Sequence, residues 1–206
     1  MGYEYIEKRR NNAEFFKNRN RSTSKVAVIN TEESNISSIS DKNDYLDRIF
    51  EILISEYDFP VDNTAIYYIF DRDPKSNLDK GLIRKLIGQL KNAYENYNGQ
   101  RGGVLLLSCP SIGAYIVSNF IDDTYLMEFD IGNKVKEYIA TQNREAQLNR
   151  ITTETLERAA NEMMKYFEAE KIDFCIDNIG QMNREVFERQ EAKYRKERVY
   201  NLVSLL

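Results

Sequence analysis

The sequence contains no histidine and no tryptophan, and only two cysteines and three prolines occur among its 206 residues. Without histidine, a Ser-His-Asp or Cys-His catalytic group and a histidine-ligated zinc ion are excluded. Cys109 and Cys175 are too few for a disulfide framework and lack the spacing of a metal-binding pair. Any catalysis must therefore depend on Asp, Glu, Lys, Tyr or a metal-bound water.

Long apolar runs are also missing. No stretch approaches the roughly 20 apolar residues that span a bilayer, and the first residues do not form a secretory signal. Hydrophobic residues make up 42% and charged residues 30% of the chain, as in folded soluble proteins. We therefore expect a cytoplasmic protein that does not enter a membrane.

The net charge of −4 is distributed unevenly, because residues 1–25 contain seven Lys or Arg residues and three Glu residues. A basic segment on an acidic protein is able to contact phosphates. The simpler interpretation is a solvated helix face followed by a basic loop.

Apolar periodicity predicts alternating strands and helices in residues 25–121, which favours an α/β fold with a small parallel sheet and flanking helices. Strands are expected at 25–29, 65–71 and 104–108, and helices at 44–57, 77–97 and after Pro110. A polar helix is expected at 3–18. After about residue 128 the pattern predicts helices alone, at 131–141, 152–170 and 181–204. The charged residues 181–198 are able to pair with another helix, but the simpler interpretation is a solvated helix face with i,i+4 pairs such as Glu185–Arg189.

These patterns divide the chain into an α/β domain, residues 1–128, and a C-terminal helical region, residues 129–206. Three clear strands are fewer than the five or six of an average sheet. We therefore expect the sheet to be incomplete. Either the chain is a fragment of a longer protein, or a partner completes the sheet, such as a second copy in a homo-oligomer.

The strand expected at 65–71 ends at Asp71, Asp73 lies two residues later, and Pro74 follows Asp73 directly. Residues i and i+2 of a strand face the same side, so both carboxylates can share one ion while Arg72 points away. Mg²⁺ prefers oxygen ligands and is often held by only one or two protein carboxylates. The same residues also fit an ordinary Asp-rich turn.

The strand at 104–108 runs into a segment, Ser108 to Gly113, where a helix is expected to begin. Backbone N–H groups at that helix start, together with Ser108 or Ser111, are able to hold an anion. The simpler interpretation is that one of the two serines caps the helix.

The order and spacing of these two motifs, FDRDP at 70–74 and LLLSCPSIGAYIVSNF at 105–120, resemble the Toprim-type module of small bacterial anti-phage nucleases. These are the RloB-like and AbiL-like abortive-infection proteins, relatives of the overcoming-lysogenisation-defect nucleases. The resemblance covers residues 65–120 best. It implies a Toprim-like fold, Mg²⁺ or Mn²⁺ at Asp71 and Asp73, a DNA or RNA substrate, and a defence-system partner protein.

The family also carries a catalytic glutamate at an earlier strand end, and the resemblance assigns this acid–base role to Glu32 or Glu33, which follow the strand at 25–29. Alternatively, 25–29 corresponds to the family's second strand and the catalytic strand lies outside this chain. The position of AEFFKN at 13–18, similar to the helix after the family's catalytic strand, favours this alternative.

Gly113 stands where the family usually has the glutamate of a Pro-x-x-Glu motif. This departure supports an alternative function, a catalytically degenerate Toprim-like regulatory or interaction subunit. A third interpretation is a phosphatase or phosphotransferase in which Asp71 attacks phosphorus and Asp73 acts as the acid. The downstream lysine and acidic pair that such enzymes need are not evident at comparable strand ends.

Overall fold

The computed structural model describes residues 3–9, 13–20, 25–29, 35–40, 45–61, 64–94, 102–142 and 150–205. The chain is of mixed α/β class and separates into two compact units, Met1–Ser34 and Asn35–Leu206. The division near residue 128 that the sequence suggested is not where the structure divides. Residues 129–206 belong to the same unit as the central strands, because they supply a helix and a strand to its core.

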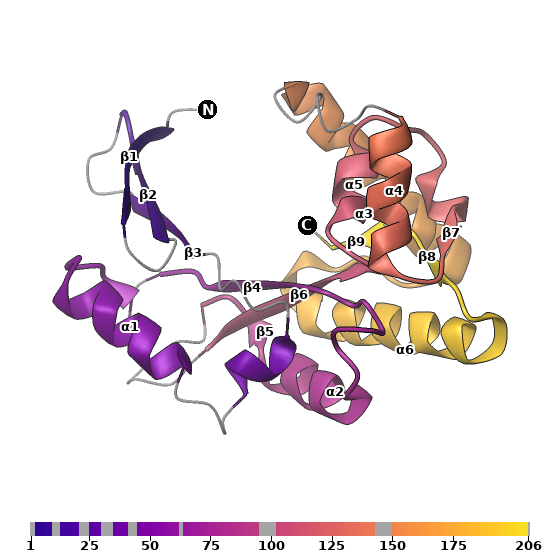
Figure 1. Ribbon diagram of the computed structural model, residues 1–206, viewed down its shortest axis with the longest axis horizontal. Helices are drawn as coiled ribbons and strands as arrows, with labels where there is room; N and C mark the ends of the chain where they lie inside the picture. The colour runs from indigo at the N-terminus through magenta and orange to yellow at the C-terminus, as the bar shows by residue number, and fades with distance from the viewer. Residues whose placement is uncertain are drawn as a thin grey trace. The chain divides into compact units, whose positions relative to one another are not determined.

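The first unit is a three-stranded antiparallel sheet of β1 (Tyr3–Arg9), β2 (Ala13–Asn18) and β3 (Lys25–Ile29) (Figure 1). The helix expected at 3–18 is therefore wrong. Aromatic residues favour strands, and Tyr5 lies opposite Phe16 with their ring centroids 5.7 Å apart. The strand at 25–29 is confirmed, but it pairs with β2 and is not part of the parallel alternation expected for it.

The second unit contains a mixed sheet in the order β4-β6-β5, with β9 also paired to β6. Its strands are β4 (Tyr67–Asp71), β5 (Lys91–Asn92), β6 (Gly103–Cys109) and β9 (Val203–Ser204). β4 and β6 run parallel, with Asp71 opposite Ser108. β5 and β9 both pair antiparallel with β6. The expected parallel sheet is thus limited to one pair of strands.

Helices surround this sheet. They are η2 (Ile36–Ile39), α1 (Tyr45–Ser55), α2 (Lys80–Gln89), α3 (Gly113–Ser118), η4 (Thr124–Leu126), α4 (Gly132–Thr141), α5 (Thr153–Glu170), η6 (Ile176–Asn178) and α6 (Ile179–Glu197). The helices expected at 44–57, 131–141 and 152–170 are confirmed. α2 is shorter than expected, because Asp79 caps its start and the chain passes from Leu90 into β5.

The segment after α6 is also different from the expectation. Arg198 has a left-handed backbone (φ 64°) and ends the helix. β8 (Tyr200–Asn201) then pairs with β7 (Glu128–Phe129), and β9 pairs with β6. The expected helix to residue 204, and the expected absence of strands after residue 128, are therefore wrong. Tyr200, Leu202 and Val203 are buried, so this segment belongs to the core.

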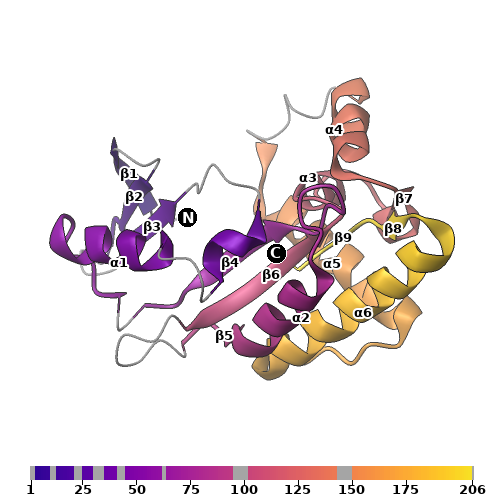
Figure 2. The same cartoon turned by 60° about the horizontal axis from the view of Figure 1, so that its bottom comes forward.

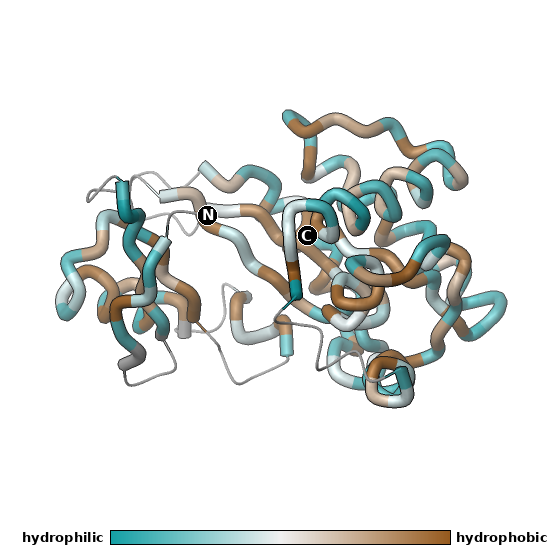
Figure 3. Tube along the Cα trace, turned by 90° about the horizontal axis from the view of Figure 1, so that it is seen from above, coloured by the Kyte–Doolittle hydropathy of each residue, from teal (hydrophilic) through white to brown (hydrophobic). Residues whose placement is uncertain are grey.

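The core is centred on β6, every residue of which is buried. On one face of the sheet, Tyr68 and Phe70 of β4 join Leu105 and Leu107 of β6. α2 and α6 lie side by side along the sheet (Figure 2) and contribute apolar side chains to the same cluster. Brown and teal residues alternate along the helices in Figure 3, as expected for amphipathic helices with one buried side. Within the described ranges, no helix combines the length and apolar character needed to cross a bilayer.

Candidate metal site at the end of strand β4

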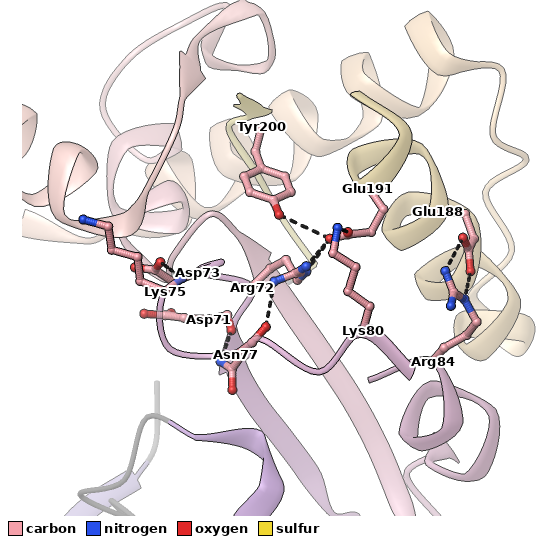
Figure 4. Close-up of polar contacts among 10 residues, drawn as sticks. All are labelled: Asp71, Arg72, Asp73, Lys75, Asn77, Lys80, Arg84, Glu188, Glu191 and Tyr200. Carbon is pink, nitrogen blue, oxygen red and sulfur yellow. Dashed lines mark hydrogen bonds and ion pairs between the residues drawn. The ribbon is translucent and has the colours of Figure 1, made fainter. Parts of the chain in front are cut away.

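Asp71 and Asp73 lie where β4 ends, at the carboxyl edge of the parallel β4–β6 pair. Both are half-buried, and Figure 4 shows them on one side of the chain while Arg72 extends to the other. The alternation expected from the sequence is therefore confirmed for this tripeptide. Ligands of open α/β sheets bind at this edge of the strands.

The Asp71 carboxylate faces the start of α3. Its Oδ1 accepts the backbone N–H of Ile112 at 2.6 Å. Burial raises the pKa of Asp71 above its ordinary value, and the negative charge of Asp73 adds to this effect. The Ile112 N–H and the positive charge of Lys136 act in the opposite direction. The two carboxylates and Lys136 are thus close enough to influence one another.

The Asp73 carboxylate is held by two backbone groups. Oδ1 accepts the N–H of Lys75 at 2.9 Å, and Oδ2 accepts the N–H of Gly132 at 3.1 Å. Gly132 is the first residue of α4, so Asp73 supplies an acceptor to a helix start that has no side-chain cap of its own. A Cβ on residue 132 would lie only 2.7 Å from Asp73 Oδ2, so this close approach requires glycine.

Mg²⁺ or Mn²⁺ is the ion that the family resemblance implies, and the donor set fits such an ion in part. Carboxylate oxygens are suitable ligands, and Mg²⁺ commonly takes its remaining ligands from water and substrate phosphates. Three of the four carboxylate oxygens already accept one N–H, although each oxygen has a second lone pair. Within the described residues, no three or more Cys, Asp or Glu side chains are arranged, here or elsewhere, so that together they could hold a metal ion.

Of the acids expected to complete the site, Glu32 and Glu33 lie outside the described residues. Residues 13–18 form strand β2, so they are not the helix that would follow a catalytic strand. At Gly113, a Cβ would lie 2.8 Å from Val135 Cγ1 and 3.2 Å from Ile139 Cδ1. α4 therefore occupies the space that a glutamate at position 113 would need.

The two serines of the second motif are engaged in the protein interior. Ser108 is fully buried, and its hydroxyl shares a 2.8 Å hydrogen bond with that of Ser204. Ser111 is also fully buried, and its Oγ accepts the N–H of Gly113 at 3.3 Å. The expected serine cap is not found, because the N-cap residue of α3 is Ile112 and it makes no side-chain cap hydrogen bond. α3 has only six residues, and neither hydroxyl is presented to an anion.

On its other side, the acidic tripeptide is anchored through Arg72. Its guanidinium forms a buried ion pair with Glu191 of α6, and both side chains are almost completely inaccessible to solvent. The sequence interpretation treated the charged residues 181–198 as a solvated helix face. A signal was present, because Glu191 follows Phe187 by four residues and so lies on the apolar side of the helix.

The helical pair expected between Glu185 and Arg189 is replaced by other contacts. Glu185 accepts a hydrogen bond from Gln181, and Arg189 lies 3.5 Å from Glu170. Lys136 and Gly132 near the aspartates were also missed by sequence reasoning. Nothing in the local pattern links them to residues about sixty positions earlier.

Comparison of the chain with protein-family models, with curated proteins and with solved structures found no match. Function is therefore inferred from the chemistry of this site.

Proposed function

We propose that the protein is a Toprim-like nuclease that uses Mg²⁺ or Mn²⁺, held by Asp71 and Asp73, to hydrolyse phosphodiester bonds of DNA or RNA in anti-phage defence. The observation that carries this proposal is the presence of two carboxylates on one side of the chain at the carboxyl edge of a parallel strand pair. The Toprim-like fold is part of the proposal. The resemblance of residues 65–120 to the Toprim-type module supports both the nuclease activity and the Toprim-like fold.

The surroundings of the two acids suit a phosphate ester. Lys75 and Lys136 are exposed cations next to the carboxylates, and Lys136 acts electrostatically on Asp71. They would attract the substrate phosphate and offset part of its charge. A divalent ion bound here would polarise a phosphoryl oxygen and lower the pKa of a bound water. In the hydrolysis, water adds to phosphorus and one P–O ester bond breaks.

A second candidate is a catalytically degenerate subunit that retains the fold for regulation or interaction. Two observations favour it. Asp71 and Asp73 each accept hydrogen bonds from a helix start, which is a structural use for both acids. In addition, Gly113 packs against α4 where the resemblance leads one to expect a glutamate.

The test is Mn²⁺ binding, followed by electron paramagnetic resonance, to the unmodified chain and to Asp71→Asn, Asp73→Asn and the double variant. Asparagine retains an acceptor for the backbone N–H groups but lacks the negative charge. We expect the affinity to fall more than the roughly 10–100-fold seen when outer-shell partners of a metal are lost. Asp58→Asn is the matched control, because Asp58 is exposed and its left-handed backbone (φ 47°) tolerates asparagine.

Cleavage of single-stranded DNA, duplex DNA and RNA by the same proteins then separates the two candidates. The proposal expects hydrolysis that requires Mn²⁺ or Mg²⁺, stops with EDTA and is absent in Asp71→Asn. Mn²⁺ binding with no hydrolysis of any substrate would favour the degenerate subunit. Unchanged Mn²⁺ affinity in a folded double variant would remove the basis of both the metal site and the nuclease.

A further inference from the structure

Arg72, the residue between the two acids, is the centre of a buried ionic cluster. Its Nε donates to Glu191 Oε1 at 2.6 Å, and the Tyr200 hydroxyl donates to the same oxygen at 3.2 Å. Lys80, in the first turn of α2, pairs with Glu191 Oε2. Arg72 and Glu191 are each 1% exposed. Figure 4 shows this cluster on the side of the chain opposite to Asp71 and Asp73.

Asn77 connects this cluster to both aspartates. Its side-chain Nδ2 donates to the carbonyl of Asp71 at 2.6 Å, and its backbone N–H donates to the carbonyl of Asp73 at 2.9 Å. The carbonyl of Asn77 accepts Arg72 Nη1 at 3.0 Å. These hydrogen bonds hold the backbone of residues 71–77 in a closed loop, and the Arg72 guanidinium donates one of them.

The ionic character of the cluster needs an explanation, because stability alone does not require it. Two charges lose their hydration when they are buried, and apolar side chains of similar volume often serve a core equally well. A guanidinium differs from an apolar side chain in its fixed directions of donation. Here those directions join the strand end, the loop at Asn77 and α6.

The direction of the Arg72 side chain also determines the directions of the Asp71 and Asp73 side chains. Side chains alternate along the extended segment, so a fixed Arg72 limits how far the backbone can twist between Asp71 and Asp73. With both backbone carbonyls held by Asn77, the two carboxylates keep their relative position. The cluster therefore acts on the geometry of the acids without touching a bound ion.

We propose that Glu191 is a positioning residue for the metal site: through Arg72 and Asn77 it holds the carboxylates of Asp71 and Asp73 in the arrangement that binds a divalent cation. This inference rests on the metal binding that is part of the proposed function. It adds that the affinity for the ion depends on a side chain of α6, far along the chain from both ligands.

The experiment measures the Mn²⁺ dissociation constant and the thermal unfolding midpoint of Glu191→Gln and of Glu188→Gln. Glu188 lies one turn earlier on α6 and pairs at the surface with Arg84, so it is the matched control. We expect Glu191→Gln to weaken Mn²⁺ binding roughly 10–100-fold, as outer-shell substitutions do. Glu188→Gln is expected to leave the affinity unchanged.

The effect of Glu191→Gln on the stability of the fold must be separated from its effect on the position of the two carboxylates. The dissociation constants are therefore measured well below the unfolding temperature. Phe167→Leu, which shortens a fully buried side chain of α5, serves as a destabilised control. A purely structural role of Glu191 would lower the unfolding midpoint, as Phe167→Leu does, and leave the Mn²⁺ affinity of the folded protein intact.

If Glu191→Gln does not fold, the double variant Arg72→Met, Glu191→Leu replaces it, because no charge is then buried without a partner. A double variant that folds and binds Mn²⁺ as tightly as the unmodified chain does would overturn the inference. If the unmodified chain shows no Mn²⁺ binding that Asp71→Asn removes, both the proposed function and the inference are wrong. Binding that needs Asp71 but is indifferent to both Glu191 variants would overturn the inference alone.

Discussion

Two arginine–glutamate pairs join α6 to the β4–α2 segment, and they differ chiefly in their exposure to water. Arg84 pairs with Glu188, and the two side chains are 43% and 44% exposed. Arg72 pairs with Glu191, one turn further along α6, and the two side chains are 1% and 2% exposed. Both pairs lie on the same side of the helix and connect nearby parts of the same segment.

Their immediate neighbour is shared as well. The ring of Phe187 lies 5.6 Å from the Arg72 guanidinium and 5.5 Å from that of Arg84. Among the described residues, the inner pair has the further hydrogen-bond or ion-pair partners Lys80, Asn77 and Tyr200, and it stands behind the two aspartates. The comparison teaches that an arginine–glutamate pair stabilises the fold little at the surface, whereas a buried pair determines the position of the residues bonded to it.

The largest effect is expected from removing one member of the inner pair. Glu191→Leu leaves the Arg72 charge buried without its partner, so the free energy of unfolding should fall by about 3–5 kcal/mol. Urea denaturation measures this change. The double variant Arg72→Met, Glu191→Leu should recover most of the loss. A decrease as small as that of Glu188→Leu would abolish the distinction between the two pairs.

An intermediate effect is expected at Tyr200, whose hydroxyl donates to Glu191. Tyr200→Phe retains the buried ring and removes one hydrogen bond to a charged acceptor, which should lower the free energy of unfolding by about 1.5–3 kcal/mol. Tyr194→Phe is the control, since Tyr194 stacks on Tyr200 at 4.5 Å and its hydroxyl has no hydrogen bond within the described residues. Equal losses in the two variants would show that the hydroxyl contact at Glu191 contributes nothing.

The smallest effect is expected from the outer pair. Glu188→Gln should change the free energy of unfolding by less than about 1 kcal/mol, and added salt should diminish even that. The hydrogen bond from Arg84 lowers the pKa of Glu188 below its ordinary value. The contribution of the pair is therefore complete above that ordinary pKa and is lost as the pH falls through the lowered one.

Urea denaturation from neutral to acidic pH tests this sign. The stability difference between the unmodified chain and Glu188→Gln should shrink as the solution is acidified. A difference that grows on acidification would mean that Arg84 does not hold Glu188 in its charged form.

Much of the fold was accessible from local patterns in the sequence. Helical periodicity located α1, α4 and α5. The alternation of side chains along a strand predicted that Arg72 points away from Asp71 and Asp73. These features depend on residues a few positions apart. The aromatic residues of 3–18 were assigned a helix in error, because the pairing of Tyr5 with Phe16 is a contact between two strands.

The partners of the site were not accessible in this way. Gly132 reaches Asp73 across 59 positions, and Glu191 reaches Arg72 across 119. No local pattern encodes such distances. An acid on the apolar side of α6 was a visible anomaly, but it showed only that Glu191 is buried and not which cation it meets. The sequence thus identified the two aspartates and left their support undetermined.

The long separation of Arg72 from Glu191 has a consequence for synthesis in the cell. A ribosome that adds about 5–20 residues per second makes Glu191 roughly 6–24 seconds after Arg72. β9, which pairs with the end of β6, follows later still. Until α6 is made, Arg72 lacks its counter-ion, and β4 and, once it is synthesised, β6 lack the helix that packs on them. The nascent chain thus exposes the apolar strands β4 and β6 until α6 is made, and the support of the candidate site forms only then.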